Sequence, residues 1–168
     1  MLQQLFARLE KSEVFKSFKA QNPDAFLCAG FFILNIKQGI NQYAIDYRND
    51  KQIFTFDFPN NENANITLKT DDLLPSPKPL EKINLDVQID IEEIQGIIEQ
   101  GLKDNNIKNQ LEEVVAVLQN LDGQIVWNLT CMLEGMTIVN AIIHSETGAI
   151  LKFAKKNLLD FVKKPGEK

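Results

Sequence analysis

The sequence is poor in the residues from which metal and catalytic centres are commonly built. Among its 168 residues there are one histidine and two cysteines. Cys28 and Cys131 lie far apart, and neither has a second cysteine or a histidine at the spacing of a zinc site. We therefore predict no metal, no cofactor and two buried free thiols in a reducing compartment.

Long apolar runs are also missing, and none approaches the roughly 18 residues that a membrane-spanning helix requires. The first residues, MLQQLFARLEKSEVFKSF, place charged side chains such as Arg8 and Glu10 among the apolar ones. A secretory signal instead has an uninterrupted apolar core and a cleavage site of small residues. We therefore expect a cytoplasmic protein that does not insert into a membrane.

Positive charge is scarce in the middle of the chain, and the formal net charge is −5. Residues 81–146 carry three lysines and twelve acidic residues, whereas residues 147–168 carry six lysines and two acidic residues. Because an acidic surface repels phosphate, we expect no nucleic-acid partner. The C-terminal lysines are predicted to form the solvated face of a helix. They are Lys152, Lys155, Lys156, Lys163 and Lys164.

Apolar periodicity predicts a first set of elements before residue 70. Residues 2–18 have the i, i+3, i+4 spacing of one amphipathic helix or of two short ones. Strands are predicted at 25–36, 43–47 and 52–58, with a weaker one at 65–69. The breaks between the first three strands are short and polar, as is typical of antiparallel hairpins.

A proline-rich segment, DDLLPSPKPL at 71–80, precedes the second set and predicts a connector, because its three prolines remove backbone donors. A helix is predicted from residue 91, since Asp90 and Glu93 fit a capping box. Strand patterns follow at 114–119, 124–133 and 136–143. A closing helix is predicted at 149–162, with Ile150, Leu151, Ala154, Leu158 and Phe161 on one face.

This order of elements predicts an α+β fold, an antiparallel sheet with helices packed on one face. It also predicts two halves of similar layout joined by the connector at 71–80. Residues 1–70 supply a helix and strands, and residues 81–168 supply a helix, strands and the closing helix. Because identity between the halves is negligible, the tandem repeat is a hypothesis based on element order alone.

Residues 90–151 end in Ser145-Glu146-Thr147-Gly148-Ala149-Ile150-Leu151 and resemble the PepSY family of small, cystatin-like domains. Thr147, Gly148 and the aliphatic pair after them fit the TG turn of that family. His144 and Ser145 stand where the family usually has an acidic residue and an alanine. The first half resembles the family in layout only. The resemblance implies a helix-on-sheet fold and a role in binding or restraining peptidases.

The only histidine, His144, lies beside this turn. Adjacent strand residues point to opposite faces, so Ser145 is poorly placed for activation by His144. Gly148 supplies backbone freedom at a tight corner, and Thr147 offers a hydroxyl to the turn backbone. The chain has no glycine-rich phosphate loop, and its paired acids are adjacent in sequence rather than convergent. We therefore predict a structural turn, no catalytic residue and no enzyme.

Aromatic residues are concentrated in the first three predicted strands. One helix does not cover them all in a small sheet, and large apolar patches are seldom left in water without use. We therefore predict partner- or ligand-binding residues among the aromatic side chains of the strands. They are Tyr43, Tyr47, Phe54, Phe56 and Trp127.

The function predicted from these features is that of a non-enzymatic module that binds a protein or peptide through the edge or face of its sheet. A PepSY-like peptidase regulator is one form of this hypothesis, and self-association is an equal use of such a surface. The alternative is a carrier that holds a small apolar ligand between the aromatic sheet and the helices. An enzyme built around His144 is the third hypothesis.

Overall fold

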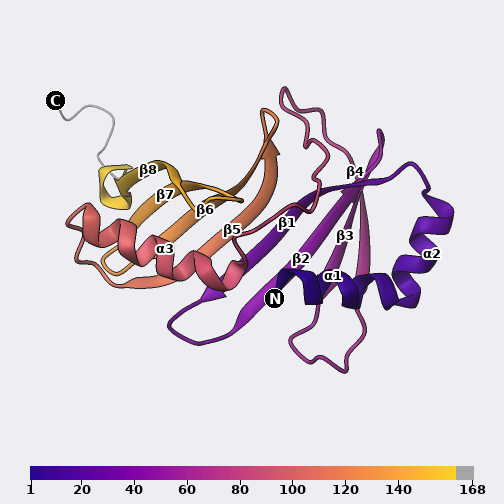
Figure 1. Cartoon of the computed structure of the whole chain (residues 1–168), viewed down its shortest axis with the longest axis horizontal. Helices are drawn as coiled ribbons and strands as arrows, with labels where there is room; N and C mark the ends of the chain where they lie inside the picture. The colour runs from indigo at the N-terminus through magenta and orange to yellow at the C-terminus, as the bar shows by residue number, and fades with distance from the viewer. Residues whose placement is uncertain (162–168) are drawn as a thin grey trace.

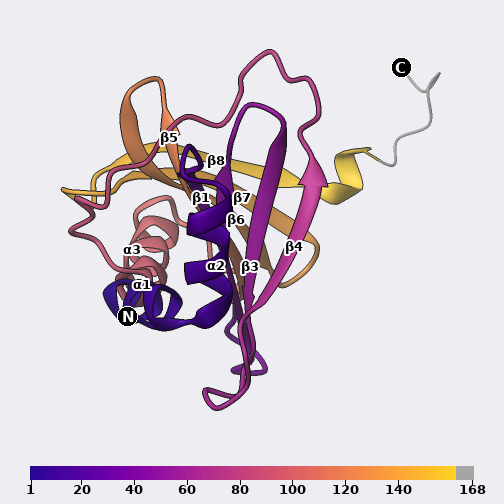
Figure 2. The same cartoon turned by 90° about the vertical axis from the view of Figure 1, so that its right-hand side faces the viewer.

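The computed structural model describes residues 1–161, which form one eight-stranded antiparallel sheet with α-helices on one of its faces (Figures 1 and 2). The helices are α1 (Leu2–Lys11), α2 (Glu13–Gln21) and α3 (Ile91–Asp104). The strands are β1 (Phe26–Asn35), β2 (Asn41–Arg48), β3 (Gln52–Phe58), β4 (Thr67–Asp72), β5 (Leu111–Leu121), β6 (Gln124–Leu133), β7 (Thr137–His144) and β8 (Ile150–Asn157). A 3-10 helix, η1 (Leu158–Phe161), follows β8. The predicted α+β class is confirmed.

The strand order β4-β3-β2-β1-β5-β6-β7-β8 places two consecutive meanders side by side. They meet through their first strands, because β1 and β5 pair antiparallel from Gly30↔Leu118 to Asn35↔Glu113. The helices α1 and α2 lie over the strands β1 to β4, and α3 lies over β5 to β8 (Figure 1). Each helical segment therefore covers the meander that follows it in the chain.

Ser12 divides the N-terminal helical segment into α1 and α2. Its backbone is extended, and its hydroxyl accepts a hydrogen bond from Phe15 N–H at 3.3 Å, which caps α2. Of the two predicted alternatives, two short helices are found. Their buried side chains recur at helical spacing and pack on the sheet. These are Leu2, Leu5, Phe6, Leu9, Phe15 and Phe18.

The predicted capping box at the start of α3 is present. The side chain of Asp90 accepts a hydrogen bond from Ile91 N–H at 2.6 Å, and the Glu93 carboxylate accepts one from Asp90 N–H at 2.8 Å. The helix then buries a stripe of side chains against the sheet. The stripe consists of Ile91, Ile94, Ile98, Gly101 and Leu102.

The closing helix predicted at 149–162 is wrong, because Ile150–Asn157 forms the edge strand β8. In its pairing with β7, Ile143 lies opposite Ile150 and Ile142 opposite Lys152, so one extra residue is inserted between them. This bulge turns both Ile150 and Phe153 toward α3, where a Cβ added at Gly101 would lie 3.0 Å from each side chain. The predicted helical face is therefore divided, because Ile150 turns toward α3 whereas Leu151 is 52% exposed.

The lysines of this region are therefore distributed along a sheet edge instead of a helix. Lys152, Lys155 and Lys156 are exposed in β8. Lys163 and Lys164 lie outside the described residues.

The segment between β4 and α3 is longer than the predicted connector. Asp71 and Asp72 belong to β4, and residues 73–89 have no regular secondary structure. This segment is nevertheless fixed to the sheet. The buried Ile83 donates its N–H to Leu27 O at 2.9 Å, tying the connector to the start of β1.

We predict that Asp90→Ala lowers the free energy of unfolding by about 1–2 kcal/mol, because Asp90 serves two helices. It caps α3 and also accepts hydrogen bonds from Leu2 N–H at 3.0 Å and from the Met1 amino group. Denaturant unfolding of the variant would show this, with Asp86→Ala on the exposed connector as control. Equal stability of the two variants would contradict the double role.

The same substitution tests a pH dependence. Burial opposes ionisation of Asp90, but hydrogen bonds from the amino terminus, Leu2 and Ile91 outweigh it and hold the pKa of Asp90 below its usual value. Its contribution to stability is thus fully present above about pH 4, the unfolded pKa, and is lost as the pH falls through the folded pKa. The stability difference between wild type and Asp90→Ala should shrink over that acid range.

Candidate functional site

The structure places three of the five predicted binding residues inside the core. Phe54, Phe56 and Trp127 have exposed fractions of 4%, 0% and 0%. Trp127 also donates its indole N–H to Ile89 O at 2.9 Å. Their side chains are therefore not available to a partner, and their role in this structure is packing.

The cover over the first three strands comes from α2, which contributes aromatic rings of its own. Phe18 lies 4.9 Å from Phe54 and 5.1 Å from Phe56, measured between ring centroids. Phe15 and Phe18 also contact the half-buried Tyr47 at 5.3 and 5.6 Å. Burial, with smaller contributions from the charges of Glu10 and Cys28, raises the pKa of Tyr47 to about 12.

This packing bears on the alternative hypothesis of an apolar carrier. The space between the aromatic strands and α2, where such a ligand would lie, is occupied by the rings just described.

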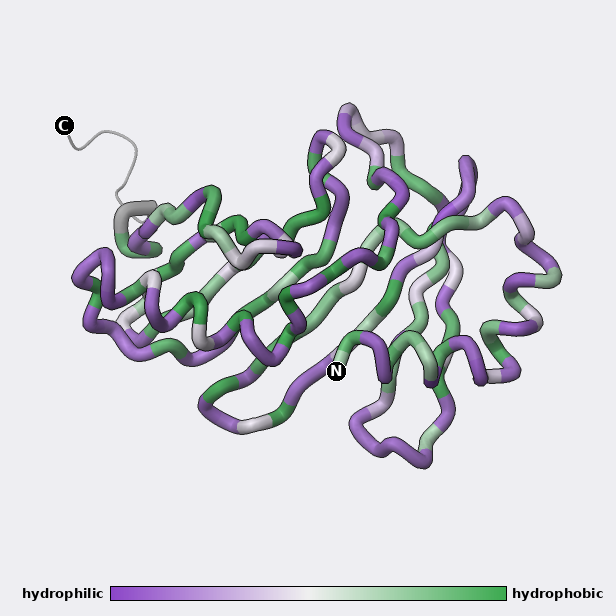
Figure 3. Tube along the Cα trace, viewed as in Figure 1, coloured by the Kyte–Doolittle hydropathy of each residue, from purple (hydrophilic) through white to green (hydrophobic). Residues whose placement is uncertain are grey.

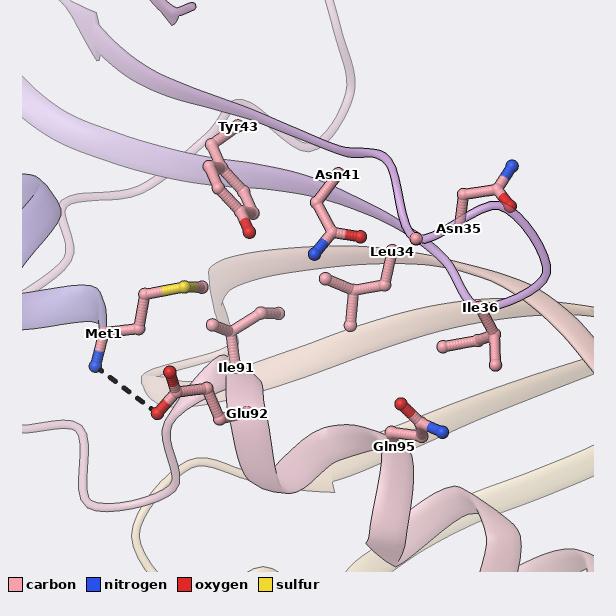
Figure 4. Close-up of a pocket in the computed structure, with 10 residues that line it drawn as sticks. Met1, Leu34, Asn35, Ile36, Asn41, Tyr43, Ile91, Glu92 and Gln95 are labelled. Carbon is pink, nitrogen blue, oxygen red and sulfur yellow. Dashed lines mark ion pairs between the residues drawn. The ribbon is translucent and has the colours of Figure 1, made fainter. Parts of the chain in front are cut away.

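Tyr43 is the predicted residue that does reach a hollow in the surface. It lines a pocket of about 420 Å³ formed by α1, α3 and the turn between β1 and β2 (Figure 4). It also lines a second pocket of about 910 Å³, which extends beneath α1 to the loop between β3 and β4. The two pockets share Met1, Gly39, Asn41, Tyr43 and Glu92. Together they form one continuous depression, called here the junction groove.

Side-chain amides dominate the polar lining of the junction groove. Figure 4 shows Asn41 and Tyr43 on one side of the first pocket, with Glu92 and Gln95 on the other. The remaining amides are contributed by β1, α1 and the β3–β4 loop, which is largely hydrophilic (Figure 3). They are Gln4, Asn35, Asn60 and Asn63.

Three charged side chains line the groove as well. Arg8 is already engaged, since its Nη2 donates to Ala64 O at 2.9 Å and its guanidinium lies 5.8 Å from the Phe58 ring centroid. Glu92 lies 3.8 Å from the Met1 amino group, and Glu62 is exposed in the β3–β4 loop. The charge of the groove is therefore balanced or slightly acidic.

The groove was not foreseen from the sequence apart from Tyr43. Its residues come from α1, β1, β2, α3 and two loops, which are distant along the chain. The only local signal is Ile40, an apolar residue between glycine and asparagine, which is 52% exposed at the β1–β2 turn.

His144 ends β7 and begins the predicted turn. Its backbone N–H donates to Ala149 O at 2.9 Å, and Gly148 N–H donates to His144 O at 3.0 Å. The imidazole Nδ1 accepts from Glu146 N–H at 3.3 Å. Gly148 has φ +72°, and Thr147 Oγ1 accepts from Ala149 N–H at 3.3 Å, as expected of a turn that uses both residues.

This turn also holds the connector. Ser145 O accepts hydrogen bonds from Gln88 N–H at 3.0 Å and from Ile89 N–H at 2.8 Å, directly before α3. A Cβ added at Gly148 would lie 3.2 Å from Ile89 Cδ1. The TG segment therefore fixes the entry to α3, which gives it a structural role.

Other reactive groups are not arranged for chemistry. Within residues 1–161 no cluster of three His, Cys, Asp or Glu side chains is close enough to hold a metal ion. Cys28 and Cys131 are free and buried, and burial is the main cause that raises the pKa of each thiol to about 12. Such thiols are protonated at neutral pH and are poor nucleophiles. Across the same residues, no helix has the length and apolar character needed to cross a membrane.

Comparison with known proteins gives a likeness in fold. No family model and no curated protein matches the sequence. A solved structure from Clostridium difficile 630, described as a "putative lipoprotein", is similar with a TM-score of 0.56 and 16% identity, over 86% of this chain and 91% of that chain. At this identity the likeness supports the architecture and carries no function.

We predict that Gly148→Ala destabilises the protein more than Gly123→Ala does. Both glycines have positive φ, +72° and +89°, but only Gly148 has a neighbour within 4 Å of the added Cβ. The control should cost about 1 kcal/mol for backbone strain, and Gly148→Ala should add the cost of displacing Ile89. Thermal unfolding of both variants would measure the difference, and equal losses would contradict the docking role of the turn.

Ser145→Ala is predicted to leave stability unchanged or to raise it by up to about 1 kcal/mol. Ser145 is 1% exposed, and its Oγ is buried without a hydrogen-bond partner among the described residues. Removing the hydroxyl removes an uncompensated polar group, while the backbone bonds to Gln88 and Ile89 remain. Chemical denaturation would decide, and a loss above 1 kcal/mol would show that the hydroxyl has a role in folding.

Proposed function

We propose that this protein is a non-enzymatic peptide-binding module and that the junction groove is its binding site. The observation that carries the proposal is the continuity of the two pockets through Met1, Gly39, Asn41, Tyr43 and Glu92. Pockets of about 300–1,000 Å³ are the usual size of ligand sites. Adjoining volumes of about 420 and 910 Å³ suit an extended segment better than a compact small molecule.

The chemistry of the lining supports a peptide as the ligand. An amide side chain offers both a donor and an acceptor, which is the pattern of a peptide backbone. Tyr43, half-buried and 5.8 Å from the Phe32 ring centroid, is a rigid aromatic surface of the kind that anchors ligands at interfaces. Glu62 makes no ion pair among residues 1–161, whereas Glu92 lies 3.8 Å from the Met1 amino group and Arg8 already bonds Ala64 O. A neutral or basic peptide is therefore favoured.

The finer form of the proposal is a PepSY-like protein of two halves that acts on a peptidase by binding it. It is supported by the layout, in which each half is a helical segment followed by a four-stranded meander. The groove lies where these halves meet. The free thiols of Cys28 and Cys131 agree with a cytoplasmic location, which stays a prediction.

The test is selection of binders from a displayed library of soluble peptides, followed by titration calorimetry. We expect Tyr43→Ala to weaken a selected peptide by about 10-fold, equivalent to about 1.4 kcal/mol. Asn41→Arg, which fills the groove without removing a packed ring, should weaken it similarly. The matched control is Gln42→Ala, since Gln42 lies between these residues on β2 and points to the opposite face of the sheet.

The location of binding is read from backbone amide shifts in NMR spectra. Shifts confined to α1, the start of α3 and residues 39–43 would support the groove. Shifts confined to the edge strands β4 or β8, or a selection that yields no peptide, would overturn the proposal.

A further inference from the structure

The face of the sheet opposite the helices is built from apolar side chains at its centre. Phe32 of β1 and Ala116 of β5 are paired, buried and directed toward the helices. The residues next to them in each strand therefore point to the opposite face of the sheet. On β1 and β5 to β7 the apolar outward residues are Phe31, Ile33, Val115, Val117, Met132, Ile138 and Ile142, and on β6 and β7 they alternate with the polar outward residues Asn128, Thr130 and Asn140. Phe31 is 38% and Met132 is 40% exposed.

No element of residues 1–161 covers this face, which is called here the open face (Figure 2). A contiguous apolar surface in the middle of a sheet is a mark of association. The whole open face, charged ends included, has an adequate size, since eight strands about 4.8 Å apart and about 20 Å long give roughly 700 Å² per copy. Stable interfaces of standard size bury about 600–1,000 Å² per partner, so this area falls within the range.

Charges lie at the two ends of the open face and differ in sign. The end formed by β2 to β4 carries three carboxylates, Asp46, Asp57 and Asp71, and two cations, Arg48 and Lys69, so one negative charge remains in excess. Lys69 is bound to Asp57 at 2.8 Å. The end formed by β8 carries Lys152 and Lys156, which make no ion pair among the described residues.

The acidic end also contains groups that lack a partner. Asp46 Oδ1 and the Nε and Nη1 of Arg48 are buried with no hydrogen bond among the described residues. Burial raises the pKa of Asp46, and the nearby charge of Asp57 acts in the same direction, whereas a hydrogen bond from Thr55 opposes it. A positive charge placed over this end would offset the repulsion between Asp46 and Asp57.

We propose that a second copy of this chain covers the open face, related by a two-fold axis that runs parallel to the strands along the β1–β5 seam. This axis brings the lysines of β8 over the acidic end of the other copy, twice in the dimer. It also brings Phe31 of one copy against Val117 of the other. A two-fold axis perpendicular to the strands would instead place lysines over lysines and aspartates over aspartates, so the charges select the first arrangement.

The first experiment is sedimentation equilibrium of the full chain. Wild type is expected at twice 19.1 kDa in the micromolar range, and Val117→Glu is expected at the monomer mass. The matched control is Leu74→Glu, which adds the same charge at an apolar residue that is 80% exposed in the connector. If Val117→Glu fails to fold by circular dichroism, Asn128→Arg, paired with Val117 on the open face, replaces it without removing apolar packing.

The second experiment tests the axis by exchanging charges. Two double variants are compared, Lys152→Glu/Lys156→Glu and Thr67→Lys/Asp71→Lys. The dimer dissociation constant of each should rise at least 10-fold over that of wild type. In the proposed geometry, an equimolar mixture of the two double variants has complementary charges at both ends and should recover the dimer mass.

Three results would overturn the proposal: a wild type that is monomeric at 100 μM or above, a dimer that survives both open-face substitutions, and a mixture that fails to associate. A complex whose mass corresponds to this chain with a different protein, instead of a second copy, would also overturn it. The junction groove lies on the helical side, so peptide binding by Val117→Glu should equal that of wild type. Failure of one proposal thus leaves the other intact.

Discussion

The antiparallel pairing of β1 with β5 is the contact on which the arrangement of the whole molecule depends. Without it, the chain would form two four-stranded meanders, each with an exposed first strand. On the helical side, Gly30 leaves room for the ring of Phe32, because a Cβ there would lie 2.8 Å from that ring. That ring in turn contacts Trp127 from the other meander, at 5.5 Å between ring centroids. The seam is thus held by backbone pairing and by aromatic packing above it.

The junction groove and the open face are both products of this seam. On the helical side, joining the meanders brings the start of α1 beside the start of α3, where Asp90 bonds to both. The groove occupies the space left between these helix ends and the β1–β2 turn. On the opposite side, the same pairing aligns the outward side chains of β1 and β5 into one apolar surface. One contact therefore creates a polar hollow on one face and an apolar surface on the other.

Local patterns in the sequence were sufficient for much of the fold. Alternation located β2, β3 and β6, and Asp90 with Glu93 located the start of α3, because these signals depend on neighbours within a few residues. The prediction for the end of the chain was wrong, since Ile150, Leu151 and Ala154 have helical spacing although they lie in a bulged strand in which Leu151 is exposed. The core position of Phe54 and Phe56 could not be foreseen either, because it depends on Phe15 and Phe18 arriving from α2. The groove combines residues as distant as Met1, Tyr43 and Glu92, whose proximity no local pattern encodes.

The two outer strands of the sheet differ in charge but share a property that limits growth of the sheet. Lysines interrupt β8 at Lys152, Lys155 and Lys156, and its first pair is displaced by a bulge, while β4 ends in Asp71 and Asp72. Charged and bulged edges resist the addition of further strands from other chains. The molecule should accordingly withstand ordered aggregation into cross-β fibrils, even though eight consecutive strands of high β propensity would otherwise favour it.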